Sequence, residues 1–116
     1  MGSYRYCIYI DGYNSKINVH NVVFDGKSID YNNSKGLIVY YGLGYISNCQ
    51  FKNFIDSGIN DTFGIDLHTS IFRLNNNVFD NNQYHIRMSN GAFANLSSGT
   101  FGTSLTANVK NINNLL

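Results

Sequence analysis

Glutamate, proline and tryptophan are absent from this chain, cysteine occurs only twice, and charged residues make up just 13% of it. Surface helices are usually rich in Glu, Lys and Ala, whereas this chain holds 19 asparagines and 11 glycines, which suit turns and left-handed backbone positions. The balance favours a β-rich, turn-rich chain over a helical one. The apolar content of 43% is enough for the core of one domain.

A short pattern occurs four times along the chain. An aliphatic residue is followed two places on by Asn or Ser and three places later by Phe, and the phenylalanines recur at intervals of 27, 28 and 22 residues. The four copies are residues 19–24, 46–51, 74–79 and 96–101. A recurrence at this period indicates stacked copies of one supersecondary unit, none of which buries its apolar side alone.

About ten residues ahead of each copy lies a pair of apolar residues separated by one position. These pairs are Ile8/Ile10, Leu37/Val39, Ile65/Leu67 and Ile86/Met88. Alternation at period two marks a strand with one buried face. Each unit therefore reads as a strand, a bend, a second short strand, an Asn turn and a third short strand at Phe. Longer polar connections are expected at 25–36, 52–64 and 80–85.

Three short strands and three bends per unit describe one coil, so the sequence predicts an all-β, right-handed parallel β-helix (solenoid) of about four coils. Like residues would then stack about 4.8 Å apart between coils. Two columns are predicted in the core, and one set of residues is predicted at the Asn bend. They are the aliphatic column Val19, Ile46, Leu74 and Leu96, the aromatic column Phe24, Phe51, Phe79 and Phe101, and the bend residues Asn21, Asn48, Asn76 and Ser98.

Over residues 4 to about 110 this pattern resembles the pectate-lyase-like right-handed parallel β-helix superfamily, in which the bend carries a buried asparagine ladder. The resemblance implies that Asn48 and Asn76 are buried and hydrogen-bonded to each other's coils. A β-sandwich with short regular strands and an intertwined triple-stranded β-fibre stay open as alternatives. A leucine-rich solenoid and an ice-binding solenoid are disfavoured, because rows of Leu and of Thr at fixed offsets are missing.

The sparse charge and the cysteine pattern exclude several partners. A net charge of +1 with scattered basic residues argues against a nucleic-acid groove. Cys7 and Cys49 fall at different points of the repeat and have no Cys/His cluster beside them, so neither a disulfide nor a zinc site is expected. No segment resembles a signal peptide or a membrane span, which predicts no membrane insertion. We expect no cofactor and no metal, and we expect residues 1–3 to be a cloning remnant ahead of a single domain at 4–116.

Candidate functional residues are those that point outward from the first strand of each coil, because the inward ones must form the core. They comprise one row of Tyr9, Ile38, Asp66 and Arg87 and a second row of Asp11, Tyr40, His68 and Ser89. Among these, carboxylates and imidazoles can serve as acid, base or nucleophile, which makes Asp66, His68 and Asp11 the catalytic candidates. The binding candidates are Arg87, which can grip a carboxylate or sulfate in a fork, and Tyr9 and Tyr40, which can stack on sugar rings.

In the resembled superfamily this outward sheet commonly binds and cuts polysaccharide. The adjacent aspartates and the Arg-x-Lys of the resembled polygalacturonases do not occur here, nor do the Asp-rich calcium sites of pectate lyases. We therefore expect a surface carbohydrate-binding β-helix, of the phage tail receptor-binding or adhesin type. It would act on a cell-surface glycan from an extracellular, cell-surface or virion location, as a segment of a longer solenoid or as a homo-oligomer, a trimer above all. A polysaccharide hydrolase or lyase and a structural spacer are the alternatives.

Overall fold

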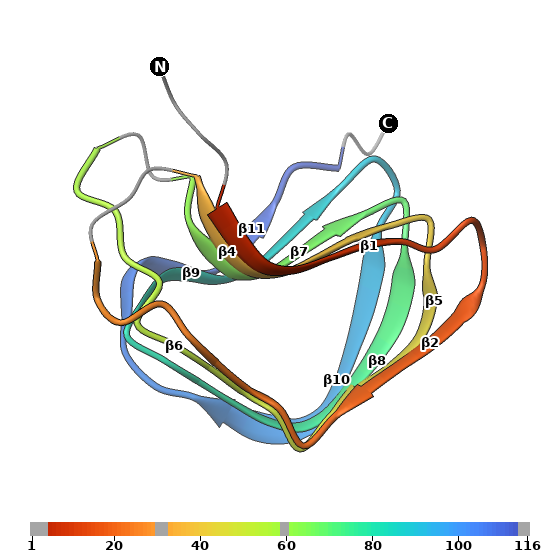
Figure 1. The fold of residues 1–116 in the computed structure, drawn as a ribbon, viewed down its shortest axis with the longest axis horizontal. Helices are drawn as coiled ribbons and strands as arrows, with labels where there is room; N and C mark the ends of the chain where they lie inside the picture. The colour runs from red at the N-terminus through yellow and green to blue at the C-terminus, as the bar shows by residue number, and fades with distance from the viewer. Residues whose placement is uncertain (1–4, 30–32, 59–60, 114–116) are drawn as a thin grey trace.

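The structure is a computed structural model that describes residues 5–29, 33–58 and 61–113. Every regular element in these ranges is a β-strand. Five strands lie side by side, all parallel, in one sheet that forms the upper side of the outline in Figure 1. In spatial order they are β1 (Arg5–Asp11), β4 (Ser34–Tyr40), β7 (Phe63–His68), β9 (Asn82–Ser89) and β11 (Ser104–Asn111).

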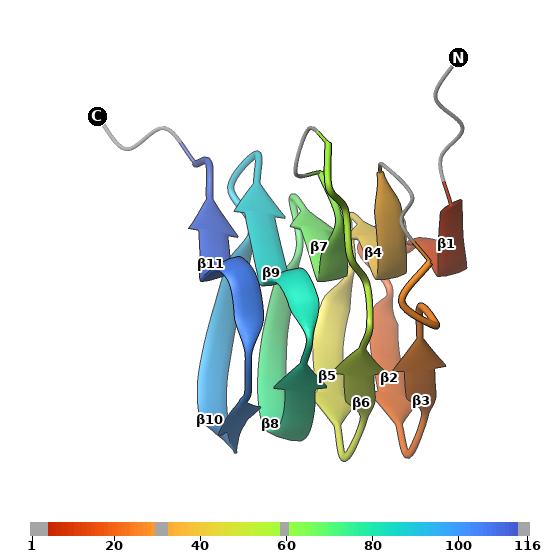
Figure 2. The same ribbon diagram turned by 90° about the vertical axis from the view of Figure 1, so that its left-hand side faces the viewer.

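The remaining strands form the other two sides of a triangular cross-section (Figure 1), and every pairing among them is parallel. They are β2 (Lys16–His20), β3 (Val23–Asp25), β5 (Leu43–Ser47), β6 (Gln50–Lys52), β8 (Ile71–Asp80) and β10 (Phe93–Phe101). The long strand β8 pairs through its first half with β5 and through its second half with β6. Figure 2 shows the coils stacked in sequence order from β1 to β11. The chain is therefore an all-β parallel solenoid of about four turns.

The strand register confirms the predicted columns, but their last members, Leu96 and Phe101, are 47% and 37% exposed and lie outside the core. Val19, Ile46, Leu74 and Leu96 are partners on successive coils, and so are Phe24, Phe51, Phe79 and Phe101. The rings of Phe24 and Phe51 stack with centroids 4.7 Å apart, and those of Phe51 and Phe79 with centroids 5.1 Å apart. The core is thus a stack of flat rings beside a stack of aliphatic side chains, and offset ring stacking adds to the burial energy.

The Asn bend adopts the predicted left-handed backbone, but its side chains lie on the surface. Asn21, Asn48 and Asn76 have φ of 58°, 53° and 56°. The amide of Asn76 donates to Oδ1 of Asn48 over 2.8 Å, so the ladder exists, yet both residues are exposed. The prediction that Asn48 and Asn76 are buried was wrong, because the left-handed residue at the apex of a corner points its side chain out of the coil.

The buried asparagine of this corner is the next residue, Asn77. Its Nδ2 donates to the carbonyl of Ile46 over 2.8 Å, and its Oδ1 accepts from the backbone N–H of Cys49 over 2.9 Å. Asn82 does the same at the following corner, with the carbonyl of Phe51 at 2.9 Å and the N–H of Phe54 at 3.1 Å. Each amide therefore satisfies two backbone groups of the coil beneath, which a kinked corner would otherwise leave unpaired in the interior.

Three further details differ from the sequence prediction. In the third and fourth coils the second and third strands merge into the single strands β8 and β10. The expected connection at 80–85 shrinks to Asn81, which has a φ of 53° and lies between β8 and β9. Strand β11, which opens a fifth coil on β9, was not predicted. Its alternation is carried by Ala107 and Val109, which are weaker apolar signals than the pairs of the earlier coils.

Candidate functional site

The outer face of the five-stranded sheet carries the candidate residues in the two predicted rows. Tyr9, Ile38, Asp66 and Arg87 are register partners across β1, β4, β7 and β9. Asp11, Tyr40, His68 and Ser89 form the neighbouring row on the same four strands. The sheet therefore brings Asp66, His68 and Arg87 into direct contact, and their roles in binding or catalysis stay predictions.

Asp66 and Arg87 form a forked ion pair between adjacent coils. Arg87 Nε donates to Asp66 Oδ1 over 2.8 Å, and Arg87 Nη2 donates to Asp66 Oδ2 over 2.6 Å. The carboxylate is fully buried although it sits on the outer face, because the larger side chains around it cover it. The guanidinium also lies over the ring of Phe63, 4.4 Å from its centroid. The donating edge of the guanidinium is thus occupied by Asp66, and one of its faces by Phe63.

The ion pair fixes the charge of both partners. Burial by itself would raise the pKa of Asp66, but the hydrogen bonds from His68 and Arg87 outweigh it and hold the pKa below its ordinary value. Burial would likewise lower the pKa of Arg87, and the contact with Asp66 raises it instead. Asp66 is therefore an ionised carboxylate, unsuited to the part of a general acid near neutral pH.

His68 links this pair to the second row. Its Nε2 lies 3.1 Å from Asp66 Oδ1, and its Nδ1 lies 2.8 Å from Ser89 Oγ. A carboxylate only accepts hydrogen bonds, so Nε2 donates to Asp66, and in the neutral ring Nδ1 then accepts from the Ser89 hydroxyl. Arg87 Nη2 also lies 3.4 Å from Nε2. The ring of Tyr40 stacks on the imidazole with centroids 4.3 Å apart. The histidine is therefore held in one orientation.

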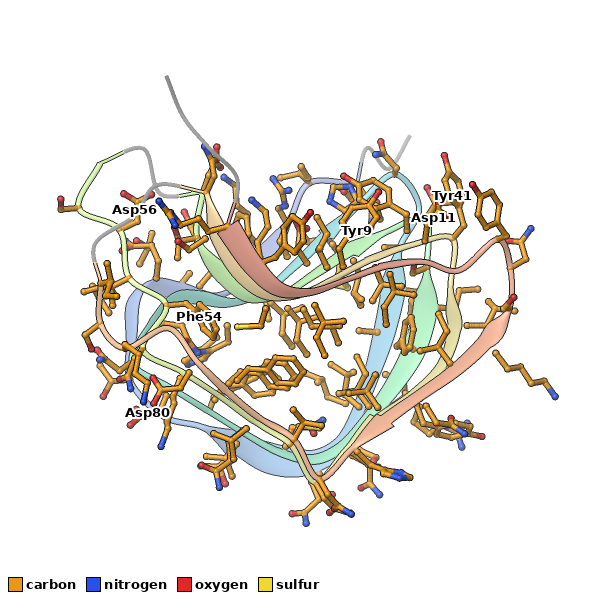
Figure 3. All side chains as sticks on the ribbon, in the orientation of Figure 1. Tyr9, Asp11, Tyr41, Phe54, Asp56 and Asp80 are labelled. Carbon is orange, nitrogen blue, oxygen red and sulfur yellow. The ribbon has the colours of Figure 1, made fainter. Side chains whose placement is uncertain are left out.

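A run of aromatic rings crosses the first coils on this face. Tyr6 and Tyr9 have ring centroids 5.4 Å apart, and Tyr9 and Tyr40 are 5.5 Å apart. Tyr6 and Tyr9 remain about half exposed, at 51% and 48%, and Figure 3 shows Tyr9 outside the coil, above β1. We call Tyr6, Tyr9, Tyr40 and His68 the aromatic row. It borders an open hollow of about 640 Å³ that Lys35, Ile38 and Arg87 complete.

Asp11 lies apart from the Asp66 cluster. It ends β1 in the row of Tyr40 and His68, and strand β4 separates it from β7. Two strand spacings amount to about 10 Å. Figure 3 shows Asp11 beside Tyr41, at the far corner of the sheet from the long connections. The geometry therefore joins Asp66 and His68 but gives Asp11 no direct part in the same contact network.

Two residues of the site, Lys35 and Phe63, were missed from the sequence. Lys35 is 3% exposed, and its Nζ donates to the backbone carbonyls of Asn33 and Asp61 over 3.3 Å and 3.4 Å. Its pKa is lowered, chiefly by burial. Lys35 and Phe63 stand at the ends of the two long connections, which emerge from one corner in Figure 1. The sequence signal that could have identified them is their position two residues ahead of the apolar pairs Leu37/Val39 and Ile65/Leu67.

The described residues contain no group of three or more His, Cys, Asp or Glu side chains placed to hold a metal ion. Both cysteines are free thiols, as the repeat positions predicted. Over the part of the chain that the structure describes, no helix has the length and apolarity to cross a membrane. Comparison of the chain with protein-family models, with curated proteins and with solved structures found no match.

Proposed function

We propose that this solenoid binds carbohydrate through the aromatic row on the outer face of its five-stranded sheet. The observation that carries the proposal is the unbroken run of rings from Tyr6 to His68, two of them half exposed, along the hollow. Sugar rings present flat C–H faces that pack on aromatic rings, while their hydroxyls need polar partners at the rim. Tyrosine provides both, since it has an apolar ring and a polar tip.

The rigidity of the platform supports recognition over nonspecific adhesion. Tyr9, Tyr40 and His68 lie on three neighbouring strands of the parallel sheet, and Tyr40 contacts the ring on either side of it. Tyr6 packs beside Tyr9 on β1. Such side chains lose little conformational freedom when a ligand binds, which keeps the entropic cost of binding low. Rings placed on successive coils also suit an extended chain of sugars more than a single one.

Cleavage of glycosidic bonds is the weaker candidate. Glycosidases of the common kind need two carboxyl groups that flank the scissile bond, one of them able to donate a proton. Asp66 is ionised, buried and bonded by both oxygens, and Asp11 lies about two strand spacings away. This arrangement favours binding by the sheet over acid–base hydrolysis by Asp66.

The biological setting that fits a glycan-binding solenoid is a receptor-binding or adhesin-like protein on a virion or cell surface. β-Helices of the pectate-lyase-like kind commonly serve there. We propose assembly into trimers with the coils side by side, because apolar side chains on successive coils are exposed outside the core. Leu43, Ile71 and Phe93 form one such row. Sedimentation equilibrium showing only the chain mass at high micromolar concentration would contradict the trimer.

A glycan array followed by titration calorimetry tests the binding function. Tyr9→Ala should weaken binding of any glycan hit by about fivefold or more, since one stacked ring contributes about 1 kcal/mol or more. Tyr9→Phe keeps the ring and should stay within a few-fold of the wild-type protein. Tyr45→Ala is the matched control, because Tyr45 is equally exposed but lies on β5, on another side of the solenoid. Equal losses for Tyr9→Ala and Tyr45→Ala, or no glycan hit, would overturn the proposal.

A further inference from the structure

Three side chains on β7 and β9 form a continuous hydrogen-bonded chain. The hydroxyl of Ser89 contacts His68 Nδ1 over 2.8 Å, and His68 Nε2 contacts Asp66 Oδ1 over 3.1 Å. His68 and Ser89 are register partners on neighbouring coils. A nucleophile, a base and a group that orients the base are thus connected in the order that acyl-transfer sites use on many unrelated folds.

Each link of this chain is fixed from outside. Arg87 holds both oxygens of Asp66, so the carboxylate cannot turn away from the imidazole. Tyr40 packs flat on the ring of His68, 4.3 Å away between centroids. Nδ1 is therefore aimed at the Ser89 hydroxyl before any ligand arrives, and in the neutral ring protonated at Nε2 it can accept the hydroxyl proton. A preset base of this kind is what converts an ordinary serine into a nucleophile.

The location of Ser89 suits a small reacting group. Ser89 is short, it follows the larger Tyr40 and His68 in the same row, and 3% of its surface is exposed. Its hydroxyl is therefore recessed below the surface, in contact with His68 at the end of the aromatic row. A sugar ring on the row would stay at the surface, while a substituent that projects from it could reach the hydroxyl.

From this geometry we propose that Ser89 is an activated nucleophile that removes O-acyl groups, such as acetyl esters, from sugars held on the aromatic row. The substrate class rests on the proposed glycan binding, whereas the reactivity of Ser89 does not. Ser89 and His68 are the catalytic residues, and Asp66 is a positioning residue that acts through His68.

The reaction balances without any partner beyond water. Ser89 Oγ attacks the acyl carbon and passes its proton to His68 Nδ1, and the sugar oxygen leaves with that proton as a hydroxyl. The acyl group is then an ester of Ser89. Water, deprotonated by Nδ1, attacks this ester and releases the carboxylic acid, while the proton returns to Oγ. Asp66 stabilises the imidazolium in both halves of the reaction.

The decisive experiment is covalent labelling with an alkyl fluorophosphonate, located by peptide mass mapping. In the folded protein the serine oxygen should displace fluoride and form a stable phosphonate ester at Ser89, at least tenfold faster than at any serine of the urea-unfolded chain. Ser89→Ala should abolish the adduct and His68→Gln should slow it at least tenfold. Ser47→Ala, on the outer side of β5, should leave the labelling unchanged. Circular dichroism checks that each variant folds.

If His68→Gln does not fold, the wild-type comparison of folded with unfolded chain still decides, because activation requires the folded contacts. The role of Asp66 is read from ¹⁵N shifts of the imidazole. The wild-type ring should be protonated at Nε2, and Asp66→Asn should move the proton to Nδ1 and suppress labelling. Labelling of Ser89 no faster than in urea, or unaffected by His68→Gln in a folded variant, would overturn the proposal.

Release of acetate from an acetylated glycan, lost in Ser89→Ala, then tests the substrate class. Labelling at Ser89 without any glycan binding would leave the nucleophile standing and remove both the glycan function and the sugar ester as substrate. Glycan binding without labelling would leave the binding function standing and remove the esterase. The two proposals therefore fail separately.

Discussion

Truncation of Phe51 to alanine probes the stacked core where its neighbours are most complete. Phe51 is fully buried and stacks on Phe24 below and on Phe79 above, with centroids 4.7 Å and 5.1 Å away. Burial of a phenylalanine side chain is worth about 1.5–3 kcal/mol, and each stacked pair adds about 0.5–1.5 kcal/mol. Phe51→Ala should therefore lower the free energy of unfolding by about 3–5 kcal/mol, as large-to-small core substitutions do.

The stacking also predicts a gradient along the column. Phe101 ends the column, is 37% exposed and meets Phe79 edge-on, so Phe101→Ala should cost clearly less than Phe51→Ala. The control is Tyr13→Ala, which removes an aromatic ring that is 80% exposed, and it should change stability by about 0.5 kcal/mol or less.

The assay is urea unfolding followed by circular dichroism, with the free energy taken from the midpoint and the slope. Since a domain of this kind is stable by about 5–15 kcal/mol, a loss of 3–5 kcal/mol moves the midpoint far outside experimental scatter. Equal costs for Phe51→Ala and Tyr13→Ala at unchanged slope would refute the stacked column.

Three further changes test the corners and the buried charges. Asn77→Ala should lower the free energy of unfolding in urea by about 1–3 kcal/mol, because it leaves the backbone groups that its amide binds buried without a hydrogen-bond partner. Asn76→Gly should lie within about 0.5 kcal/mol of the wild type. The reverse order would support the buried ladder at Asn76. Asp66→Asn should cost about 3–5 kcal/mol at pH 7 by leaving Arg87 unpaired. The pKa of Asp66 is lowered on folding, so its contribution to the free energy of unfolding is complete above its unfolded pKa of about 3.9 and is lost as the pH falls through the lower folded value. Below about pH 4 the Asp66→Asn variant should therefore lose less stability than the wild type does. Thermal unfolding across pH checks this. The pKa of His85 is also lowered, chiefly by burial, so the unfolded chain takes up a proton at this residue first and stability should fall as the pH drops below about 6.5. His85→Leu should reduce the change of the unfolding midpoint with pH between pH 7 and 5. An unchanged pH dependence in that window would show that His85 is not the group involved.

The columns of the core could be predicted because the offset between the Asn bend and the phenylalanine stays constant when the length of the coil changes. Phe24, Phe51 and Phe79 keep a fixed offset from their Asn bends, and the register needs only that offset. The lengths of the connections do not enter. The same logic placed Asp66 and Arg87 as neighbours, since each lies between the two apolar residues of its strand.

The error at Asn76 shows what an offset cannot determine. A left-handed residue reverses the alternation of side chains at the corner, so the amide that enters the interior is Asn77, one residue later. The repeat alone does not distinguish the two, because its other copies place Cys49 and Gly99 at the position of Asn77. Only the hydrogen-bonding needs of the kinked backbone select it.

The sequence predicted on which face of the sheet the site residues lie, but it did not predict which side chains they contact. Alternation set Asp66, His68 and Tyr40 on the outer face, but the burial of Asp66 depends on how the larger side chains of adjacent coils fold over it. Lys35 and Phe63 escaped prediction because they precede the alternating pairs, at the ends of connections that carry no periodic signal.

Nuclear magnetic resonance with ¹³C-labelled tyrosine rings tests the central claim, glycan binding by the aromatic row, most directly. The seven tyrosines that the structure describes lie on several sides of the solenoid, so they report which face a glycan contacts. Titration with a glycan found on the array should shift the ring signals of Tyr6, Tyr9 and Tyr40 together and leave those of Tyr13 and Tyr45 in place. Shifts confined to Tyr13 or Tyr45, or no shift at a saturating glycan concentration, would contradict the account.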